Sequence, residues 1–209
     1  MLPGPQLIYQ CPACKGLLAK GSLMSGNTFG GTFYSDGRFF APMLPQFPQI
    51  SKCAECNHIF WLNEKNLMET IDWNDPDFNR FEKVPDADFL RLEDYIQLIQ
   101  QKFYMDSEEE RFLRFEVWRG FNDKKRAGKE LWNSENEQLI WQENLETLIT
   151  LIQPEWEQES LTLAELHRNF GRFEKALEIL SEIRDKRHKE TVQKLMAECR
   201  KKNKEVIKY

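Results

Sequence analysis

The chain shows two different patterns of apolar and polar positions. Up to residue 62, short apolar runs alternate with turn-forming residues, and seven of the ten glycines and six of the nine prolines lie in this part. Glycine and proline interrupt helices, so short strands joined by turns are predicted there. From residue 86 onwards, apolar residues recur every three or four positions, which predicts amphipathic helices. The pattern therefore predicts an α+β fold that is mostly α, with a small β region first.

The β region contains one hairpin signal. Residues 32–40 carry aromatic side chains on both sides of an Asp-Gly dipeptide, which is typical of a tight hairpin turn. Pro42, Pro45 and Pro48 follow at every third position, the period of a polyproline II segment. These features fit either an aromatic platform with an extended, ligand-like stretch or the core of a small metal domain with a stiffened loop. The second interpretation is favoured, because tiny metal domains need large side chains to bury enough area.

The second part is predicted to contain a series of helices. Asp86 is the expected N-cap of the first helix, and a Ser-x-x-Glu capping box at residues 134–137 begins another, which Pro154 ends. A polar, mostly basic stretch over residues 123–129 predicts a break between helices. The helices expected from apolar spacing cover residues 87–105, 108–121, 135–153 and 188–205.

Four of the five cysteines form two Cys-x2-Cys pairs separated by 38 residues. Each pair can wrap a tight turn around a metal ion, and two such turns supply four soft thiolate ligands in a tetrahedron. This donor set suits structural Zn²⁺ and leaves no open position for a substrate. The predicted metal ligands are Cys11, Cys14, Cys53 and Cys56.

The same residues allow alternatives to a structural zinc site. The run Cys11-Pro-Ala-Cys14 is similar to a thioredoxin-type redox motif, but that chemistry needs a helix beginning at the cysteine, and glycines follow here instead. Iron in a rubredoxin-like site would use the same four ligands and stays open. His58, two residues after the last ligand, could replace a cysteine, although four thiolates already complete the shell.

The cysteine pattern resembles a zinc ribbon, with a spacer longer than the usual template. Near the other end, the segment 163–177 resembles the turn and second helix of a tetratricopeptide repeat. Four residues match the small, glycine and aromatic positions of that repeat in order and spacing, namely Ala164, Gly171, Phe173 and Ala176. His167 stands where an aromatic residue is usual, and the first-helix tryptophan is absent.

Together, the two ends of the chain resemble uncharacterised bacterial proteins with an N-terminal four-cysteine zinc-ribbon-like region and a C-terminal tetratricopeptide-like helical domain. The resemblance names no activity. The expected organisation is a metal domain over residues 1–70, a linker over 71–85, and a helical domain over 86–209 with the repeat at about 158–205.

The formal net charge of −5 is unevenly distributed. Residues 1–62 carry 4 basic and 2 acidic side chains, residues 63–181 carry 15 and 27, and residues 182–209 carry 10 and 5. Four zinc-bound thiolates would bring the first segment to about zero. The chain then consists of a neutral metal domain, an acidic helical body and a basic terminal helix, which favours protein partners over nucleic acid.

The sequence contains no recognisable catalytic constellation and no apolar run long enough to span a bilayer. The paired cysteines favour a reducing, cytoplasmic setting, and no secretory signal or membrane partner is expected. We therefore expect a non-catalytic zinc-binding scaffold that binds a protein or peptide on its helical surface. The alternative is a nucleic-acid-binding zinc ribbon with a helical accessory domain. Cys199, on the apolar face of the last helix, is expected to be a buried thiol.

Overall fold

The structure is a computed structural model that describes residues 1–72, 74–76 and 78–209. Its contacts divide the chain into two compact units. The β unit consists of Met1–Gly31 and Phe40–Leu90, and the helical unit consists of Thr32–Phe39 and Arg91–Tyr209. Two residues of the expected linker, Trp73 and Asp77, lie outside the described residues. The α+β, mostly α class predicted from the sequence is confirmed.

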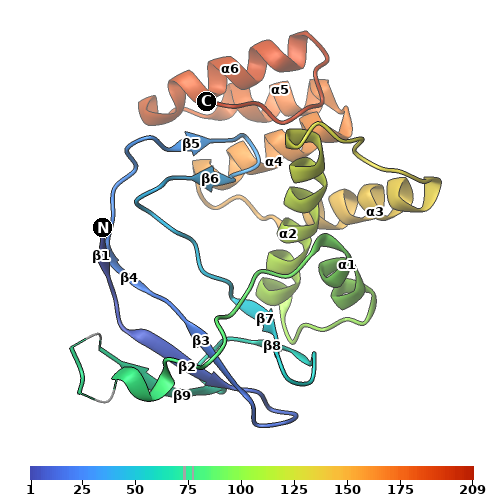
Figure 1. Ribbon diagram of the computed structural model, residues 1–209. Coiled ribbons are helices and arrows are strands. Elements are labelled where there is room, and N and C mark those ends of the chain that lie inside the picture. The colour runs from blue at the N-terminus through green and yellow to red at the C-terminus, as the bar shows by residue number, and fades with distance from the viewer. Residues whose placement is uncertain (73, 77) are drawn as a thin grey trace. The chain divides into compact units, whose positions relative to one another are not determined.

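Short antiparallel strands build the β unit (Figure 1). A three-stranded sheet has the order β3-β2-β9, and two-stranded pairs join β1 to β4 and β7 to β8. The strands are β1 (Leu2–Pro3), β2 (Gln6–Gln10), β3 (Leu17–Lys20), β4 (Leu23–Ser25), β7 (Ile50–Lys52), β8 (Ile59–Trp61) and β9 (Leu67–Ile71), and the short 3-10 helix η1 covers Phe78–Phe81.

The three-stranded sheet buries both of its faces, because neighbouring residues of a strand point to opposite sides. Tyr9 of β2 packs in one cluster with Phe60 of β8 and with two of the cysteines. Its neighbour Ile8 packs on the other face, in a cluster with Phe81 of η1. The β7–β8 hairpin and the 3-10 helix thus supply apolar cover for the two faces.

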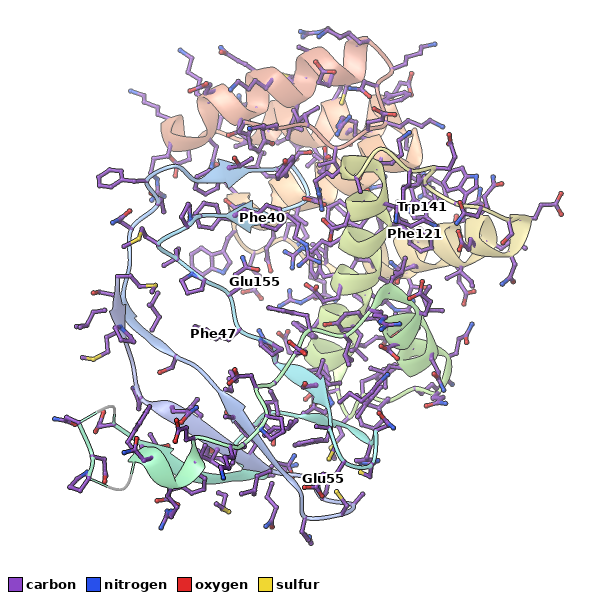
Figure 2. All side chains as sticks on the ribbon, in the orientation of Figure 1. Phe40, Phe47, Glu55, Phe121, Trp141 and Glu155 are labelled. Carbon is purple, nitrogen blue, oxygen red and sulfur yellow. The ribbon has the colours of Figure 1, made fainter. Side chains whose placement is uncertain are left out.

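Helices that follow one another in sequence pack against each other in the helical unit. Its core includes Trp118 and Phe121, which are fully buried, and Trp141, which stacks on Phe170 with ring centroids 6.0 Å apart. Figure 2 shows Phe121 and Trp141 on α2 and α3. The helices are α1 (Leu92–Gln100), α2 (Ser107–Arg126), α3 (Glu135–Leu151), α4 (Glu157–Phe170), α5 (Phe173–Glu182) and α6 (Lys189–Arg200), with the 3-10 turn η2 (Lys186–His188) before α6.

Two details of the helices differ from the sequence expectation, and a third agrees with it. The first helix begins at Leu92 with Arg91 as its N-cap, whereas Asp86 forms a parallel bridge with Ala19 of β3. The helix break predicted over residues 123–129 begins later than expected, because α2 continues to Arg126. Basic side chains suit that position, since they interact favourably with the carbonyl end of a helix. The Ser134 cap is confirmed, because its hydroxyl accepts a hydrogen bond from the Glu137 amide at 3.1 Å.

The predicted aromatic hairpin forms, as β5 (Thr32–Phe33) and β6 (Phe39–Phe40), with Gly37 in the left-handed region of the turn. Its residues 32–39 group with the helices, although they lie in sequence between the two cysteine pairs. In Figure 1 the hairpin lies beside α4. The domain bounds expected from the sequence stay a prediction, and this grouping assigns the hairpin differently.

Buried polar groups attach the hairpin within the helical unit. Asp36, only 2% exposed, accepts hydrogen bonds from Asn122 at 3.0 Å and from Arg126 at 2.8 Å. Arg38 forms an ion pair with Glu116 at 3.0 Å. The end of the chain adds backbone hydrogen bonds, including one from the Tyr209 amide to the Phe33 carbonyl and one from the Ser35 amide to the Ile207 carbonyl.

No helix in the described part of the chain combines the length and the apolar character needed to cross a lipid bilayer.

Candidate metal centre

Each cysteine pair lies in the turn of an antiparallel hairpin. Cys11 and Cys14 follow β2 and precede β3, and Cys53 and Cys56 connect β7 to β8. The strands hold these turns in place, so that the four thiols converge although the two pairs are far apart in sequence. The structure therefore brings together all four residues that the sequence predicted as ligands.

The spacing of the sulfur atoms fits a tetrahedral metal site. The Sγ atoms of Cys11 and Cys56 are 3.7 Å apart, those of Cys14 and Cys53 are 3.5 Å apart, and all four lie within 4.8 Å of one another. Zinc–sulfur bonds of about 2.3 Å in a tetrahedron require sulfur–sulfur distances of about 3.8 Å. All the cysteines are free thiols. The four side chains are thus positioned to hold one metal ion.

The two turns have the same backbone pattern. The Cys11 amide donates to the Gly16 carbonyl, and the Cys11 carbonyl accepts from the Lys15 amide at 3.0 Å. The second turn repeats this pattern. The Cys53 amide donates to the His58 carbonyl, and the Cys53 carbonyl accepts from the Asn57 amide at 3.0 Å. The equivalent residues Lys15 and Asn57 both have positive φ values, 68° and 61°. The two cysteine turns are therefore structurally equivalent halves of one site.

These two positive-φ residues are the part of the site that sequence reasoning did not identify. A non-glycine residue rarely adopts this conformation, although asparagine tolerates it. Both residues directly follow the second cysteine of their pair, and this position is the one signal in the sequence. Glycine is the usual residue in a left-handed conformation, so a lysine there does not predict it. The turn places backbone amides beside the sulfur atoms, as with the Gly16 amide, which lies 3.4 Å from the Cys14 Sγ.

Backbone amides and crowding of the thiols shift their acidity in opposite directions. Burial opposes ionisation of Cys53, but the Cys56 and Glu55 amides and the neighbouring thiols outweigh it and lower its pKa to about 7. The Gly16 amide favours the Cys14 thiolate, yet the other three sulfurs and desolvation raise the pKa of Cys14 to about 12. Cys53 therefore ionises readily near neutral pH, whereas a bound cation would favour ionisation of Cys14.

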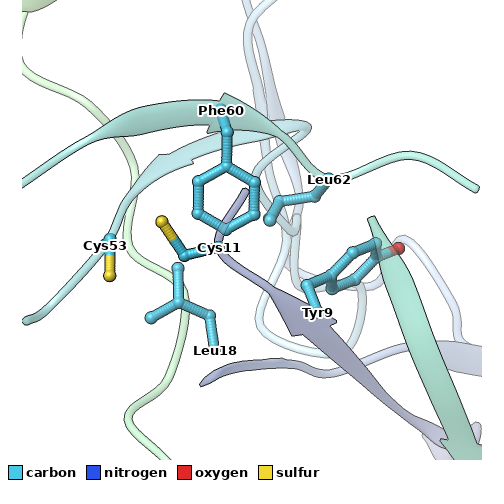
Figure 3. Packing of buried hydrophobic residues seen from close by; sticks show 6 residues of the cluster. All are labelled: Tyr9, Cys11, Leu18, Cys53, Phe60 and Leu62. Carbon is cyan, nitrogen blue, oxygen red and sulfur yellow. The ribbon is translucent and has the colours of Figure 1, made fainter. Parts of the chain in front are cut away.

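The inner half of the site belongs to the apolar core of the β unit (Figure 3). Cys11 and Cys53 are buried and pack with Leu18 and Phe60, whereas Cys14 and Cys56 are exposed. One carboxylate lies at the exposed side, because Glu55, labelled in Figure 2, has Oε2 3.9 Å from the Cys14 Sγ. The burial of one cysteine from each pair means that removing the ligands would also disturb this core.

The alternatives left open by the sequence can now be compared with the geometry. No helix begins at Cys11, because β3 follows the turn, so the helix that lowers the thiol pKa in a thioredoxin-type site is lacking within these described residues. His58 does not belong to the cluster of converging ligand atoms. Its backbone carbonyl accepts a hydrogen bond from the Cys53 amide at 2.9 Å. Four thiolates in this arrangement bind either Zn²⁺ or iron.

A second group of potential ligands, Glu157, Asp185 and His188, has its carboxylates already engaged. Both oxygens of Glu157 accept backbone amides, from Arg184 at 2.9 Å and Asp185 at 2.8 Å. Asp185 accepts the Arg187 amide and guanidinium, and these hydrogen bonds lower the pKa of Asp185 to about 2. These two carboxylates therefore satisfy backbone amides in the connection between α5 and α6.

Comparison with known proteins adds no assignment to this site. No protein-family model matches the chain, and no curated protein or solved structure matches it.

Proposed function

We propose that the protein is a non-catalytic zinc-binding scaffold, in which a zinc-ribbon-like unit accompanies a tetratricopeptide-like helical unit that binds a protein or peptide. The observation that carries this proposal is the convergence of four cysteine thiols from two equivalent turns. Four thiolates fill a tetrahedral shell, so the metal would have no free position for a substrate or an activated water. Zn²⁺ is favoured because the site offers only sulfur donors and nothing in the fold calls for electron transfer.

Packing of α4 and α5 supports the tetratricopeptide-like half of the proposal. Ala164 and Ala176 are 1% and 0% exposed, as expected for small residues that let two helices approach closely. Gly171 ends α4 with a φ of 89°, the left-handed cap that suits glycine. Phe173 packs against the same core cluster. Free thiols fit a reducing compartment, and we therefore propose a cytoplasmic location.

Elemental analysis of the purified protein tests the metal half of this function. We expect close to one zinc per chain, and loss of that zinc in the Cys14→Ser and Cys53→Ser variants. Cys199→Ser is the matched control, because Cys199 lies in the helical unit outside the cluster. Stoichiometric iron would change the assignment of the metal, and a metal-free folded protein would refute the site.

Binding measurements test the scaffold half. We expect no tight binding to DNA or RNA at moderate salt, because acidic side chains predominate over residues 63–181. Tight, salt-sensitive binding to a nucleic acid would favour the other class of function, a nucleic-acid-binding zinc ribbon.

A further inference from the structure

A hollow of about 370 Å³ lies between the end of α5 and the start of α6. Its apolar lining comes from Leu180 and Ile183 on one side and from Val192 and Met196 on the other. Leu180 is buried, and the other three pack on the same core while remaining half-exposed. The volume lies at the low end of the range of about 300–1,000 Å³ for ligand pockets. The hollow can therefore take an apolar side chain without rearrangement of the helices.

Three cations line the same hollow. They are Arg184, Lys186 and Lys189, all exposed at the connection between the two helices. Among the residues that the structure describes, no acidic side chain forms an ion pair with any of them. Asp185 is the acidic residue in the lining, and the Arg187 guanidinium already holds its carboxylate at 2.6 Å. The rim thus carries positive charge that the protein itself does not neutralise.

A second, larger hollow differs from this one because its cations are paired with carboxylates. It measures about 640 Å³ and lies between the β5–β6 hairpin, α4 and α6. Its cations are paired, Arg38 with Glu116 at 3.0 Å and Lys194 with Glu190 at 3.0 Å. Any anion entering there would have to compete with these carboxylates. The smaller hollow therefore has the stronger demand for an external acidic group.

We propose that the α5–α6 hollow binds an acidic, amphipathic segment of a partner protein. An apolar side chain of that segment would occupy the hollow, and its carboxylates would lie against Arg184, Lys186 and Lys189. This inference rests on the proposed scaffold function and names the place and the chemistry of the partner. Amphipathic segments dock in this way when apolar anchors recur at helical spacing and charge surrounds the groove.

The lining favours a peptide over a nucleic acid. Nucleic-acid surfaces use rows of cations along a backbone together with aromatic stacking platforms. Here, three cations surround an aliphatic floor, and the hollow has no aromatic residue in its lining among the described residues. An aliphatic or aromatic side chain flanked by glutamates or aspartates satisfies both parts of the site.

Fluorescence anisotropy of the metal-loaded full chain tests the proposal. The probe is a labelled, acetylated peptide of about twelve residues, with leucine at every third or fourth position and glutamate elsewhere. A matched peptide with glutamine in place of glutamate measures the contribution of charge. We expect the acidic peptide to bind more tightly than the glutamine peptide, with an affinity that falls as salt is added.

Two variants locate the binding. The double variant Lys186→Gln, Lys189→Gln removes two rim charges and is expected to weaken binding of the acidic peptide by about fivefold or more. Gln193→Trp places a large side chain at an exposed lining position and is expected to weaken binding by filling the hollow. The double variant Lys129→Gln, Lys175→Gln changes the net charge equally outside the lining, and it should bind as the unmodified protein does.

Three results would overturn the proposal. They are no preference for the acidic peptide, equal loss in both double variants, or tighter binding of a single-stranded oligothymidine of similar length. The last result would also refute the scaffold function. The first two would refute only the partner site, because zinc content is measured separately. Circular dichroism of each variant establishes that a loss of binding does not come from unfolding.

Discussion

The hydroxyl of Ser35 donates a hydrogen bond of 2.6 Å to the carboxylate of Glu165. Ser35 lies between the two cysteine pairs in the sequence, and Glu165 belongs to α4 and is fully buried. The same carboxylate forms a forked ion pair with Arg168, whose guanidinium reaches the backbone carbonyls of Asn203 and Glu205. One buried ion pair therefore connects the spacer hairpin, α4 and the last segment of the chain.

This connection gives part of the long spacer between the cysteine pairs a structural role in the helical unit. Sites made from two Cys-x2-Cys pairs commonly have a shorter spacer, and residues 32–39 of this spacer form a hairpin that is part of the helical unit. The chain crosses between the units on both sides of that hairpin. Residues 32–39 therefore belong with the helices, whereas the rest of the spacer and its flanking cysteines belong to the β unit.

Removing the Glu165 carboxylate is expected to destabilise the protein strongly. Glu165→Gln leaves Arg168, which is 0% exposed, without its charge partner. Breaking one side of a buried ion pair costs about 3–5 kcal/mol in the free energy of unfolding. Ser35→Ala removes one hydrogen bond to the pair and should cost about 1–2 kcal/mol. Urea denaturation followed by circular dichroism measures both values.

Ser160→Ala is the matched control for Ser35→Ala. Ser160 is a half-buried serine on α4, the helix that also holds Glu165. Its substitution should change the free energy of unfolding by less than about 0.5 kcal/mol. An effect of Ser35→Ala no larger than this control would mean that the hydroxyl does not hold the hairpin in solution.

Metal removal is expected to affect the cysteine turns but not the hairpin of residues 32–39. Structural zinc contributes directly to folding, so chelation should expose the backbone amides around Cys11 and Cys53. Residues 32–39 should stay protected, because their polar contacts lie in the helical unit. Hydrogen exchange with mass spectrometry, with and without chelator, measures the two segments in one experiment. A hairpin that loses protection together with the cysteine turns would instead support a continuous metal domain over residues 1–70.

The sequence predicted the local features of this protein well. The convergence of the four cysteines was predicted from their spacing, the hairpin from an Asp-Gly turn between aromatic arms, and the α4–α5 turn from Gly171. Each of these signals lies within a few neighbouring residues, where backbone geometry limits the choices. The α+β class followed from the same local signals.

Distant pairing could not be predicted in the same way. Asp36 looks like an ordinary turn residue, yet it is 2% exposed and bound to Arg126, 90 residues further along the chain. Nothing in the local pattern around Arg126 identifies that partner, and the basic stretch predicted a break between helices. The expected cap Asp86 failed for the same reason, because pairing with β3 determined its conformation. Charged residues that pair with distant parts of the chain were therefore the main source of error.

The stability of the helical unit should fall as the pH drops below about 6.5. Burial lowers the pKa of His167, and the nearby charges of Arg172 and Lys175 lower it further. The folded state therefore favours the neutral imidazole, whereas the unfolded chain binds the proton near the ordinary pKa. Unfolded molecules then take up more protons, so the stabilisation is present above pH 6.5 and is lost as the pH falls towards the folded pKa. Urea midpoints between pH 7.5 and 5.5 measure this, with values chosen to bracket the ordinary histidine pKa of about 6.5.

His167→Gln supplies the comparison, because glutamine does not titrate in this range. The variant should show a flatter dependence of the urea midpoint on pH than the unmodified protein. Equal slopes for the two proteins would assign the pH dependence to other groups and contradict the effect of His167.

The Cys199 thiol is expected to be inert in the folded protein. It is 2% exposed, and burial raises its pKa to about 11, so little reactive thiolate exists at pH 8. Treatment with iodoacetamide at about pH 8, followed by peptide mass spectrometry, should leave Cys199 unmodified until denaturant is added. In metal-free protein, Cys53 should react much earlier, because removal of the metal is expected to expose the cysteine turns. Modification of Cys199 at the rate of a free cysteine under native conditions would show that the α4–α6 core opens readily and would contradict its buried position.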